Sequence, residues 1–368
     1  MTDATADLPT EMQRSSRDLH ELRTALIGWL QGRQPGAEVG ELQTTSATGM
    51  SSDTLLFDAS WDGTTEHLVA RLAPAAEDVP VFPSYDLGRQ FELIRTVGER
   101  TPVPVPRTFW HEPDRSVIGT EFFVMSRVDG LVPPDLLPYN FGDSWLFAAS
   151  SEQQRVLQDA TVDVLAHLHA MEPLPFLRFD EPGDTALRRH VAHSAAWYEY
   201  VAADGVRSPL IERAFAWLDE HWPDESDAVT CWGDSRIGNV IYGPDFTPVA
   251  VLDWEMAGLG PRELDVAWLI YSHRGFEDIA HALGLEGMPH FLRRADVVER
   301  YQSRTGHELR DLDFYEVYAA VQFAIVYLRV NARSAHFGER EMPEDPNELL
   351  YNREPLERML AGDYFGED

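Results

Sequence analysis

Three oxygen-bearing side chains, Asp234, Asn239 and Asp253, flank two short apolar runs in the segment CWGDSRIGNVIYGPDFTPVAVLDWE, residues 231–255. A turn with Pro and Gly separates the two runs, which predicts a pair of short antiparallel strands. Asp234 and Asn239 stand at the start of this pair and Asp253 at its end, so the hairpin can bring the three together. Carboxylate and amide oxygens suit Mg²⁺. Asp253 and Asn239 are therefore the candidate magnesium ligands, and Asp234 is left to accept a proton from a hydroxyl group.

This layout is similar to the phosphoryl-transfer site of the kinase fold, in which a catalytic-loop Asp, an Asn five residues later and a downstream Asp cooperate. The residues WGDSRIGN resemble the HGDxxxxN loop of the aminoglycoside phosphotransferase and choline kinase group, and LDWE stands where that group has its metal-binding IDxx. The segments LDWEMAGLG and FFVMSRVDG are typical of the branch that includes the kinase domains of acyl-CoA dehydrogenase family fusions. The competing interpretation is two polar turns beside a buried strand pair.

The resemblance implies an α+β, bilobal, protein-kinase-like fold with a small β-rich lobe and a larger helical lobe. We expect a disordered N-terminus over residues 1–15, a nucleotide-binding lobe over 16–127, and a catalytic and substrate-binding lobe over 128–368. The implied cofactors are ATP and Mg²⁺, with Asp234 as the catalytic base. The implied partner is a small-molecule hydroxyl acceptor, either aminoglycoside-like or of a hydroxyacyl type.

Hydrophobic periodicity supports this order of elements. Leucines at helical spacing predict a helix over 16–32, and a second helix is expected over 84–100. Strand-like segments surround the second helix, and the chain after residue 151 is mostly helical apart from the hairpin. The expected strands are 39–46, 53–61, 66–74, 102–112 and 119–130, and the expected later helices are 151–171, 185–203, 209–221, 262–274, 291–305 and 312–334, with one more short helix near the C-terminus.

Every one of the 30 basic residues is arginine, so the strand lysine that anchors nucleotide phosphates in this fold has no counterpart. Arg71, in LVAR of the third strand, resembles that position, and a guanidinium can hold two phosphate oxygens at once. The alternative is a surface arginine on an edge strand. The helix residue that normally pairs with the anchor aligns with Gln90. Glu92, two residues later, should point to another helix face.

Two further segments are candidates for nucleotide contacts. The turn between the first two strands carries Gly49, Ser51 and Ser52, whose small side chains would let backbone N–H groups approach phosphate. An ordinary hairpin turn explains it nearly as well. The strand FFVMSRVDG resembles the segment that passes the adenine, where the backbone of Ser126 and Val128 would bind the base edge.

Further residues around the catalytic loop complete the expected site, and one of them departs from the family. Trp232 replaces the usual His, and an indole can pack there but donates only one hydrogen bond. Arg236 could steady the transferring phosphoryl group or pair with a nearby carboxylate. Glu255 could be a second carboxylate ligand of the metal or an outer-shell partner of the site, because residues two apart on an extended segment face the same side. Asp265 and His169 are interpreted as structural supports of the loop.

Composition limits the class of partner. A net charge of −32 argues against nucleic acid and anionic membranes, and no stretch reaches the roughly 20 apolar residues of a membrane span. The polar N-terminus has no signal-peptide core, and a single cysteine, Cys231, permits no internal disulfide. We therefore expect a cytoplasmic protein.

Three functions remain in competition. The first is a small-molecule O-kinase, and the second is a nucleotide-binding scaffold with little or no activity, suggested by Gln90, Trp232 and the missing lysine. The third, a protein kinase, is disfavoured because the segment between Asp253 and Asp265 leaves no room for an activation loop. Aromatic residues in the expected acceptor region suit a partly apolar acceptor, although at least half should be core. These are Tyr139, Phe141, Trp145, Trp268, Tyr271 and Tyr327.

Overall fold

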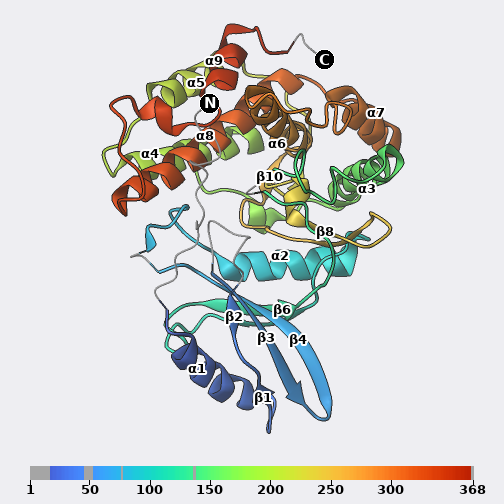
Figure 1. Cartoon of the computed structure of the whole chain (residues 1–368), viewed down its shortest axis with the longest axis vertical. Helices are drawn as coiled ribbons and strands as arrows, with labels where there is room; N and C mark the ends of the chain where they lie inside the picture. Colours follow the sequence, from blue (N-terminus) through green and yellow to red (C-terminus); the bar gives the residue numbers. More distant parts are fainter. Residues whose placement is uncertain (1–16, 45–52, 76–77, 136–137, 366–368) are drawn as a thin grey trace. The chain divides into compact units, whose positions relative to one another are not determined.

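The computed structural model describes residues 17–44, 53–75, 78–135 and 138–365, and the chain divides into two compact units. Unit 1 comprises residues 1–100 and 104–129, and unit 2 comprises residues 101–103 and 130–368. Gly49, Ser51 and Ser52 lie outside the described residues, as does the N-terminal segment 1–15. Figure 1 shows a twisted sheet with helices beside it in unit 1 and a mostly helical unit 2.

Unit 1 is built on a six-stranded antiparallel sheet in the order β1-β3-β4-β6-β5, with β2 also paired to β3. In β3 and β4, apolar residues such as Leu55, Phe57, Leu68 and Ala70 are buried at alternate positions, because successive side chains of a strand face opposite sides. The strands are β1 (Glu38–Val39), β2 (Gln43–Thr44), β3 (Asp53–Trp61), β4 (Thr64–Leu72), β5 (Thr108–Glu112) and β6 (Phe122–Ser126).

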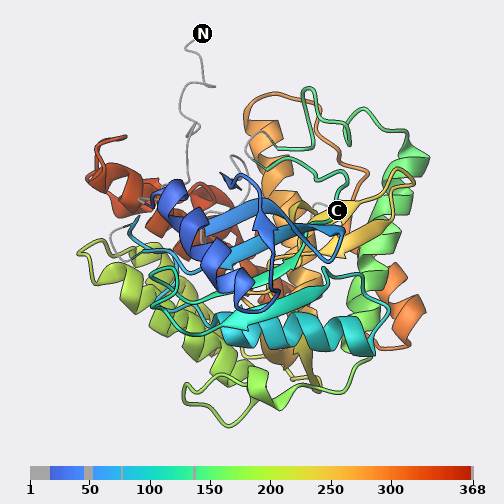
Figure 2. The same ribbon diagram turned by 90° about the horizontal axis from the view of Figure 1, so that it is seen from below.

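Two helices cover the two faces of this sheet, as Figure 2 shows. Helix α1 (Leu19–Gln31) is capped by Asp18, whose carboxylate accepts two backbone N–H groups of the first turn. Its buried leucines Leu22, Leu26 and Leu30 join one core cluster with Phe122 and Val124. Helix α2 (Leu87–Arg100) lies against the opposite face, where Phe91 contacts Phe123. Successive side chains of β6 face opposite sides of the sheet, so Phe122 and Val124 pack on the α1 side and Phe123 packs on the α2 side.

Two predicted strands of unit 1 form only in part. The segment predicted over 39–46 divides into β1 and β2, because between the Val39–Ala59 and Gln43–Leu56 pairs the three residues 40–42 face only the two residues 57–58, and the extra residue interrupts the ladder. The segment predicted over 102–112 becomes a strand only from Thr108, because its three prolines, Pro102, Pro104 and Pro106, donate no ladder hydrogen bonds.

Unit 2 contains two short strand pairs that carry the catalytic segment. Strand β7 (Ala228–Cys231) pairs with β10 (Gly258–Pro261), and β8 (Val240–Tyr242) pairs with β9 (Pro248–Val251). The second pair is the predicted hairpin. The short helix η3 (Ile237–Asn239) leads directly into β8. Residues 232–239 and 252–257 therefore form the two loops that connect these pairs.

Helices make up most of the rest of unit 2, and α8 is the most buried of them, with sixteen buried residues along both its faces. The helices are α3 (Ser151–His169), α4 (Ala186–Ala202), α5 (Pro209–Glu220), α6 (Glu263–Ala282), α7 (Arg294–Thr305), α8 (Leu312–His336) and α9 (Arg353–Ala361), with short 3₁₀ turns η2 (Pro175–Leu177) and η4 (Pro346–Leu349). Within the described part of the chain, none of the helices is long and apolar enough to cross a bilayer.

The connecting segment 128–147 contains turns and one isolated β-bridge within its described part. Leu131 and Tyr242 exchange two backbone hydrogen bonds of 2.8 Å, which fixes the start of this connection against β8. Gly130 permits the contact, because a Cβ there would overlap the Ile241 side chain and the Tyr242 carbonyl. Asp135 is thereby brought to the catalytic loop.

Candidate active site

The loop from Trp232 to Asn239 depends on a glycine at its sharpest point. Gly233 has φ +91°, a backbone conformation that residues with a Cβ rarely adopt. A side chain at this position would also overlap the backbone carbonyl of Met256. Gly233 therefore lets the catalytic loop pass directly beside the segment that follows Asp253.

Asp265 holds this loop by its backbone. Its carboxylate accepts the N–H of Trp232 at 2.7 Å and the N–H of Gly233 at 2.9 Å, and its carbonyl accepts the hydroxyl of Ser235 at 2.8 Å. His169 Nε2 donates to the same carboxylate at 3.0 Å, while its Nδ1 lies 2.7 Å from the Tyr301 hydroxyl. Both residues are buried and occupy the structural positions that the sequence indicated.

His169, Asp265 and Cys231 place ligand-type atoms within 4.8 Å of one another, but their hydrogen bonds explain the cluster without a metal. Both nitrogens of His169 and both carboxylate oxygens of Asp265 already have partners. Burial raises the pKa of the Cys231 thiol, so the protonated form is favoured, and the thiol faces the Gly260 carbonyl at 3.5 Å. We interpret the cluster as packing beneath the loop.

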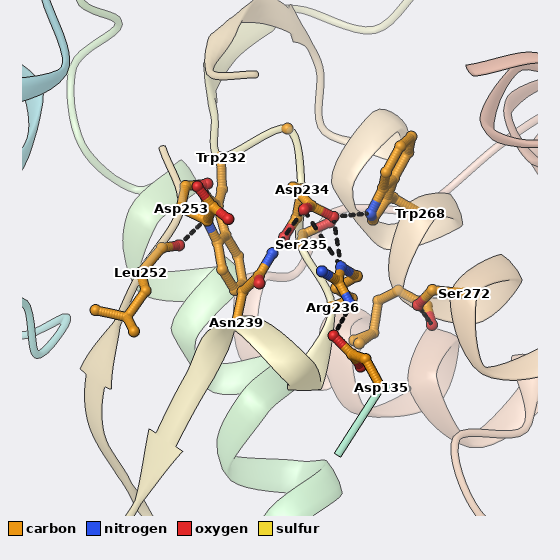
Figure 3. A network of polar contacts seen from close by, with 12 residues as sticks. Asp135, Trp232, Asp234, Ser235, Arg236, Asn239, Leu252, Asp253, Trp268 and Ser272 are labelled. Carbon is orange, nitrogen blue, oxygen red and sulfur yellow. Dashed lines mark hydrogen bonds and ion pairs between the residues drawn. The ribbon is translucent and has the colours of Figure 1, made fainter. Parts of the chain in front are cut away.

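The carboxylate of Asp234 is surrounded by three hydrogen-bond donors (Figure 3). Oδ1 accepts the indole N–H of Trp268 at 2.8 Å and the Nε–H of Arg236 at 3.0 Å. Oδ2 accepts the amide of Asn239 at 2.7 Å. The carboxylate is thus fixed at both oxygens, by donors from its own loop and from α6.

Opposing effects act on the pKa of Asp234. Burial is the largest and raises it; the positive charge of Arg236 and the donors Asn239 and Trp268 lower it, and the negative charge of Asp253 raises it again. The net result is a pKa above the ordinary value for an aspartate. A raised pKa makes the carboxylate a stronger proton acceptor than a solvated aspartate, which suits a general base.

Arg236 pairs with two carboxylates, which is the second of the two roles considered from the sequence. Its Nε lies 3.0 Å from Asp234, and its Nη1 binds Asp135. Burial alone would lower the pKa of this guanidinium, but the charges of Asp135 and Asp234 outweigh it and raise the pKa, so Arg236 stays charged. Sequence analysis missed Asp135, because it lies about a hundred residues before its partner and carries no motif.

The indole of Trp232 links the two loops of the site. Its N–H donates to the backbone carbonyl of Leu252 at 2.8 Å and lies 3.2 Å from that of Asp253. The ring is fully buried and contacts Trp254. A single donor shared between two carbonyls therefore ties the segment before Asp234 to the segment that carries Asp253.

Asp253 adopts a left-handed backbone conformation, with φ +59°. This conformation is uncommon for a residue with a side chain and recurs at functional sites. It also overturns the premise used for Glu255. The chain is not extended from 253 to 255, because it turns at Asp253 and a further turn follows, closed by the Ala257 N–H to Trp254 carbonyl hydrogen bond of 3.2 Å. Residue spacing therefore gives no reason to place Glu255 beside Asp253.

Asn239 has its amide group oriented by the loop. The Nδ2 group donates to the carboxylate of Asp234 and, at 3.1 Å, to its backbone carbonyl. The amide oxygen then points away from Asp234, and Figure 3 shows Asn239 and Asp253 on the same side of that residue. An amide oxygen and a carboxylate form a donor set that fits Mg²⁺.

The candidate nucleotide residues lie in unit 1. Arg71 is in β4, paired with Thr54 of β3 and Phe123 of β6, so the strand is interior and the edge-strand alternative is wrong. The side chain of Gln90 on α2 is buried, whereas Glu92 binds Arg95 on the helix surface at 2.6 Å.

Ser126 ends β6, and its polar groups are partly engaged. Its N–H donates to the Arg107 carbonyl at 2.8 Å, and its hydroxyl accepts the Arg107 N–H at 2.9 Å. A backbone contact from Ser126 to a base would therefore use its carbonyl oxygen. Val128 lies two residues further on, outside the strand. Met125, the residue before Ser126, is buried in the core.

Comparison with known families agrees with this geometry. The profile of the phosphotransferase enzyme family matches residues 47–296, a span that includes every residue described above in the catalytic loop. The chain belongs to the phosphotransferase enzyme family. The predicted resemblance is thereby confirmed.

Curated relatives of this phosphotransferase chain are named as acyl-CoA dehydrogenases or as members of the acyl-CoA dehydrogenase family. It is 26% identical to the probable acyl-CoA dehydrogenase IBR3 of Arabidopsis thaliana, in an alignment that covers 92% of this chain and 42% of the relative. The chain thus spans less than half the length of that relative. Acyl-CoA dehydrogenase family member 11 of Mus musculus is also 26% identical and is covered over 33% of its length. The predicted branch within the family agrees with these matches.

Solved structures establish the kinase-like fold of this family member. A Ralstonia eutropha protein provisionally named an aminoglycoside phosphotransferase matches with a TM-score of 0.65 and 22% identity, over 93% of this chain and 97% of the other. A ternary complex of aminoglycoside phosphotransferase APH(4)-Ia with ADP and hygromycin B matches with a TM-score of 0.53 and 14% identity, over 93% and 98%. The predicted fold class is confirmed.

Aromatic residues of unit 2 divide between core and site. Tyr139, Trp268 and Tyr271 are buried, and Tyr271 accepts the Asn352 amide at 2.9 Å. A series of ring contacts also leads from Trp268 through Phe323 and Tyr327 to the exposed Tyr351, with centroid distances of 4.6, 6.0 and 5.2 Å. The sequence indicated the aromatic character of this region, but not that Trp268 reaches Asp234.

Proposed function

We propose that this protein is an ATP- and Mg²⁺-dependent phosphotransferase that moves the γ-phosphate to a hydroxyl group of a small molecule, with Asp234 as the catalytic base. The observation that carries the proposal is the Asp234 carboxylate, largely withdrawn from solvent, held at both oxygens and beside Asn239, whose amide oxygen points away from it. Membership of the phosphotransferase enzyme family supports the class of reaction.

Asp234 would accept the hydroxyl proton as the acceptor oxygen attacks the γ-phosphorus. Its elevated pKa favours this step, and its hydrogen bonds keep the carboxylate from rotating during the transfer. Arg236 is less suited to direct contact with the phosphoryl group, because its Nη1 and Nε already bind Asp135 and Asp234. Its positive charge beside Asp234 still offsets the charge that accumulates in the site.

Asn239 and Asp253 would hold the magnesium ion, which supplies charge neutralisation at the β- and γ-phosphates. The hydrogen bond from the Asn239 amide to Asp234 orients the amide oxygen for such a role, as supporting contacts do in metal sites generally. Glu255 would contribute less, since the turn after Asp253 removes the spacing argument for it.

Unit 1 would contribute the nucleotide contacts. Arg71 would anchor phosphate oxygens with its guanidinium, the Ser126 carbonyl and the Val128 backbone would contact the base, and Gln90 would support the anchor without an ion pair. The turn that carries Gly49, Ser51 and Ser52 would approach the phosphates. The ADP complex of a protein with the same fold supports an adenine nucleotide.

The acceptor would be an alcohol with an apolar portion, either an aminoglycoside-like compound or a hydroxyacyl compound. A protein of the same fold binds hygromycin B. The ring contacts from Trp268 to Tyr351 offer an aromatic surface that begins at the base. A panel of aminoglycosides, hydroxyacyl-CoA esters and choline-like alcohols, tested for phosphorylation with MgATP, distinguishes these classes.

The second candidate is a nucleotide-binding scaffold with little activity. It is favoured by Gln90, which offers Arg71 no charge, and by the replacement of the loop histidine with Trp232. The indole of Trp232 nevertheless joins both loops of the site. A magnesium-dependent ATPase assay with Asp234→Ala as the control separates the two: an active kinase loses MgATP turnover in this variant, whereas a scaffold binds nucleotide and has no turnover to lose.

A further inference from the structure

The indole of Trp268 contacts the proposed base directly. Its N–H donates to Oδ1 of Asp234 at 2.8 Å, and both side chains are largely withdrawn from solvent (Figure 3). An indole nitrogen carries one N–H and accepts no hydrogen bond. Trp268 therefore cannot remove the proton from a substrate, but it can hold the group that does.

Helix α6 contacts the catalytic loop at two positions, three residues apart. Asp265 binds the loop backbone at Trp232 and Gly233, and Trp268 binds the Asp234 side chain. Residues three apart lie on the same face of a helix. One face of α6 thus fixes both the path of the loop and the orientation of its carboxylate.

The ring of Trp268 is itself held in place. Phe323 of α8 stacks on it, with the ring centroids 4.6 Å apart and the planes inclined by 25°. The other donors to Asp234 have additional partners, since Arg236 binds Asp135 and Asn239 binds the Asp234 carbonyl. Trp268 is the donor to Asp234 that comes from outside the catalytic loop among the contacts described.

We infer that Trp268 is a positioning residue for phosphoryl transfer. With Asn239 on Oδ2 and Trp268 on Oδ1, the carboxylate is restrained at both ends and presents a fixed direction to the acceptor hydroxyl. Proton transfer is sensitive to such placement, since small displacements of a catalytic group cost large factors in rate. The inference rests on the proposed function, because it assigns Trp268 a role through Asp234.

The test compares Trp268→Phe with a matched control, Trp29→Phe. Trp29 is also buried and donates its indole N–H to a carboxylate, that of Glu112, at the same 2.8 Å, but in unit 1. Both substitutions remove one N–H and keep an aromatic ring. The assay measures hydrolysis of MgATP by the amount of ADP released, with water taking the place of the acceptor.

Trp268→Phe should lower turnover by about ten- to a hundredfold and leave KM for MgATP unchanged, because it alters the orientation of the base and not nucleotide binding. Trp29→Phe should keep wild-type turnover. In the double variant Trp268→Phe, Asp234→Asn, turnover should be no lower than in Asp234→Asn alone, because the orientation of an absent base has no effect. If the losses in turnover from the two single variants add up in the double variant, the role of Trp268 is wrong. The same holds if Trp268→Phe keeps wild-type turnover while Asp234→Asn is slow. In both cases the proposed function still stands.

A second measurement does not depend on turnover. In ¹H–¹⁵N spectra, the indole signal of Trp268, assigned by its loss in Trp268→Phe, should move in Asp234→Asn, while the signal of Trp29 stays in place. An unmoved Trp268 signal overturns the hydrogen bond and with it the inference. Wild-type turnover in Asp234→Asn has a different meaning: it removes the proposed base, and with it the proposed mechanism.

Discussion

Gly238 packs against the carboxylate of Asp135, so closely that a Cβ at position 238 would overlap both Asp135 oxygens. The absence of a side chain at 238 lets Asp135 reach Arg236, which in turn binds Asp234. A residue inside the catalytic loop thus controls access of a distant carboxylate to the site. Because φ at Gly238 is not positive, alanine is compatible with the backbone there and tests this contact alone.

Gly238→Ala should displace Asp135 and leave Arg236 paired with Asp234 only. We expect a loss of about 1 kcal/mol in the free energy of unfolding, since the overlap can be relieved by moving one side chain. In an Asp135→Ala background, the same change should cost nearly nothing, because the group that it displaces is gone. Urea unfolding of the single and double variants measures both values, and equal costs in the two backgrounds would contradict the contact.

Asp234→Asn addresses the proposed base. The amide keeps the size of the carboxylate but cannot accept the proton in the same way, so turnover should fall by ~10²–10⁴ with nucleotide affinity nearly intact. Initial-rate measurements with MgATP, beside equilibrium titration of ADP, give the two quantities. If the Asn variant turns over like the wild type, another group removes the proton.

Asp253→Ala addresses the metal. Loss of this carboxylate should abolish the dependence of nucleotide binding on Mg²⁺, because the ion would keep only the amide oxygen of Asn239. Glu255→Gln is the matched control, and it should weaken binding less, since the chain turns after Asp253 and the extended spacing that would place Glu255 beside it is absent. Calorimetric titration with MgATP that shows unchanged affinity in Asp253→Ala would falsify the ligand assignment.

The sequence predicted the parts of the site that depend on local spacing. Asp234, Asn239 and the β8–β9 hairpin lie within one short segment, so turn chemistry and apolar alternation were sufficient to relate them. The roles of Asp135 and Trp268 were not predictable in this way. Their contacts with Arg236 and Asp234 depend on tertiary packing over distances in sequence that no local periodicity encodes.

Elsewhere, the prediction was limited because the backbone conformation differs from the one that the sequence pattern indicated. The left-handed conformation of Asp253 removed the spacing argument for Glu255, because the rule for extended chains does not apply there. The helix expected over 262–274 continues through Gly275 to Ala282. An interior glycine costs a helix only about 1 kcal/mol, and burial of residues such as Ala280 and contact with α8 are sufficient to offset it.

Arg71→Ala addresses the phosphate anchor in a chain without lysine. We expect a loss of ~1.5–3 kcal/mol in ATP binding, the range of hydrogen bonds to charged groups. Arg71→Lys should recover only part of it, because an ammonium group replaces a guanidinium that can contact two oxygens. Binding of ATP and adenosine measured in parallel is the check: an anchor for phosphate affects ATP alone, and equal losses for both ligands would point to a role in folding instead.

His273 predicts how stability depends on pH. Burial lowers its pKa to about 4, an effect that the Met288 carbonyl opposes and the charge of His290 reinforces. The neutral ring donates from Nε2 toward Met288 at 3.3 Å, lies 3.8 Å from Glu277, and receives the Tyr139 hydroxyl on Nδ1 at 2.9 Å.

Between the ordinary pKa of 6.5 and the folded value of about 4, the unfolded chain takes up a proton at His273 and the folded chain does not. The contribution of neutral His273 to stability is therefore complete above pH 6.5 and is lost as the pH falls, by up to about 1.4 kcal/mol per pH unit. His273→Gln should remove this loss, so that its stability relative to wild type improves between pH 7.5 and pH 4.5. His307→Gln, at an exposed position, is the control and should follow the wild type at every pH. Urea unfolding across this range measures the difference, and parallel curves for wild type and His273→Gln would show that His273 is not the group that takes up the proton.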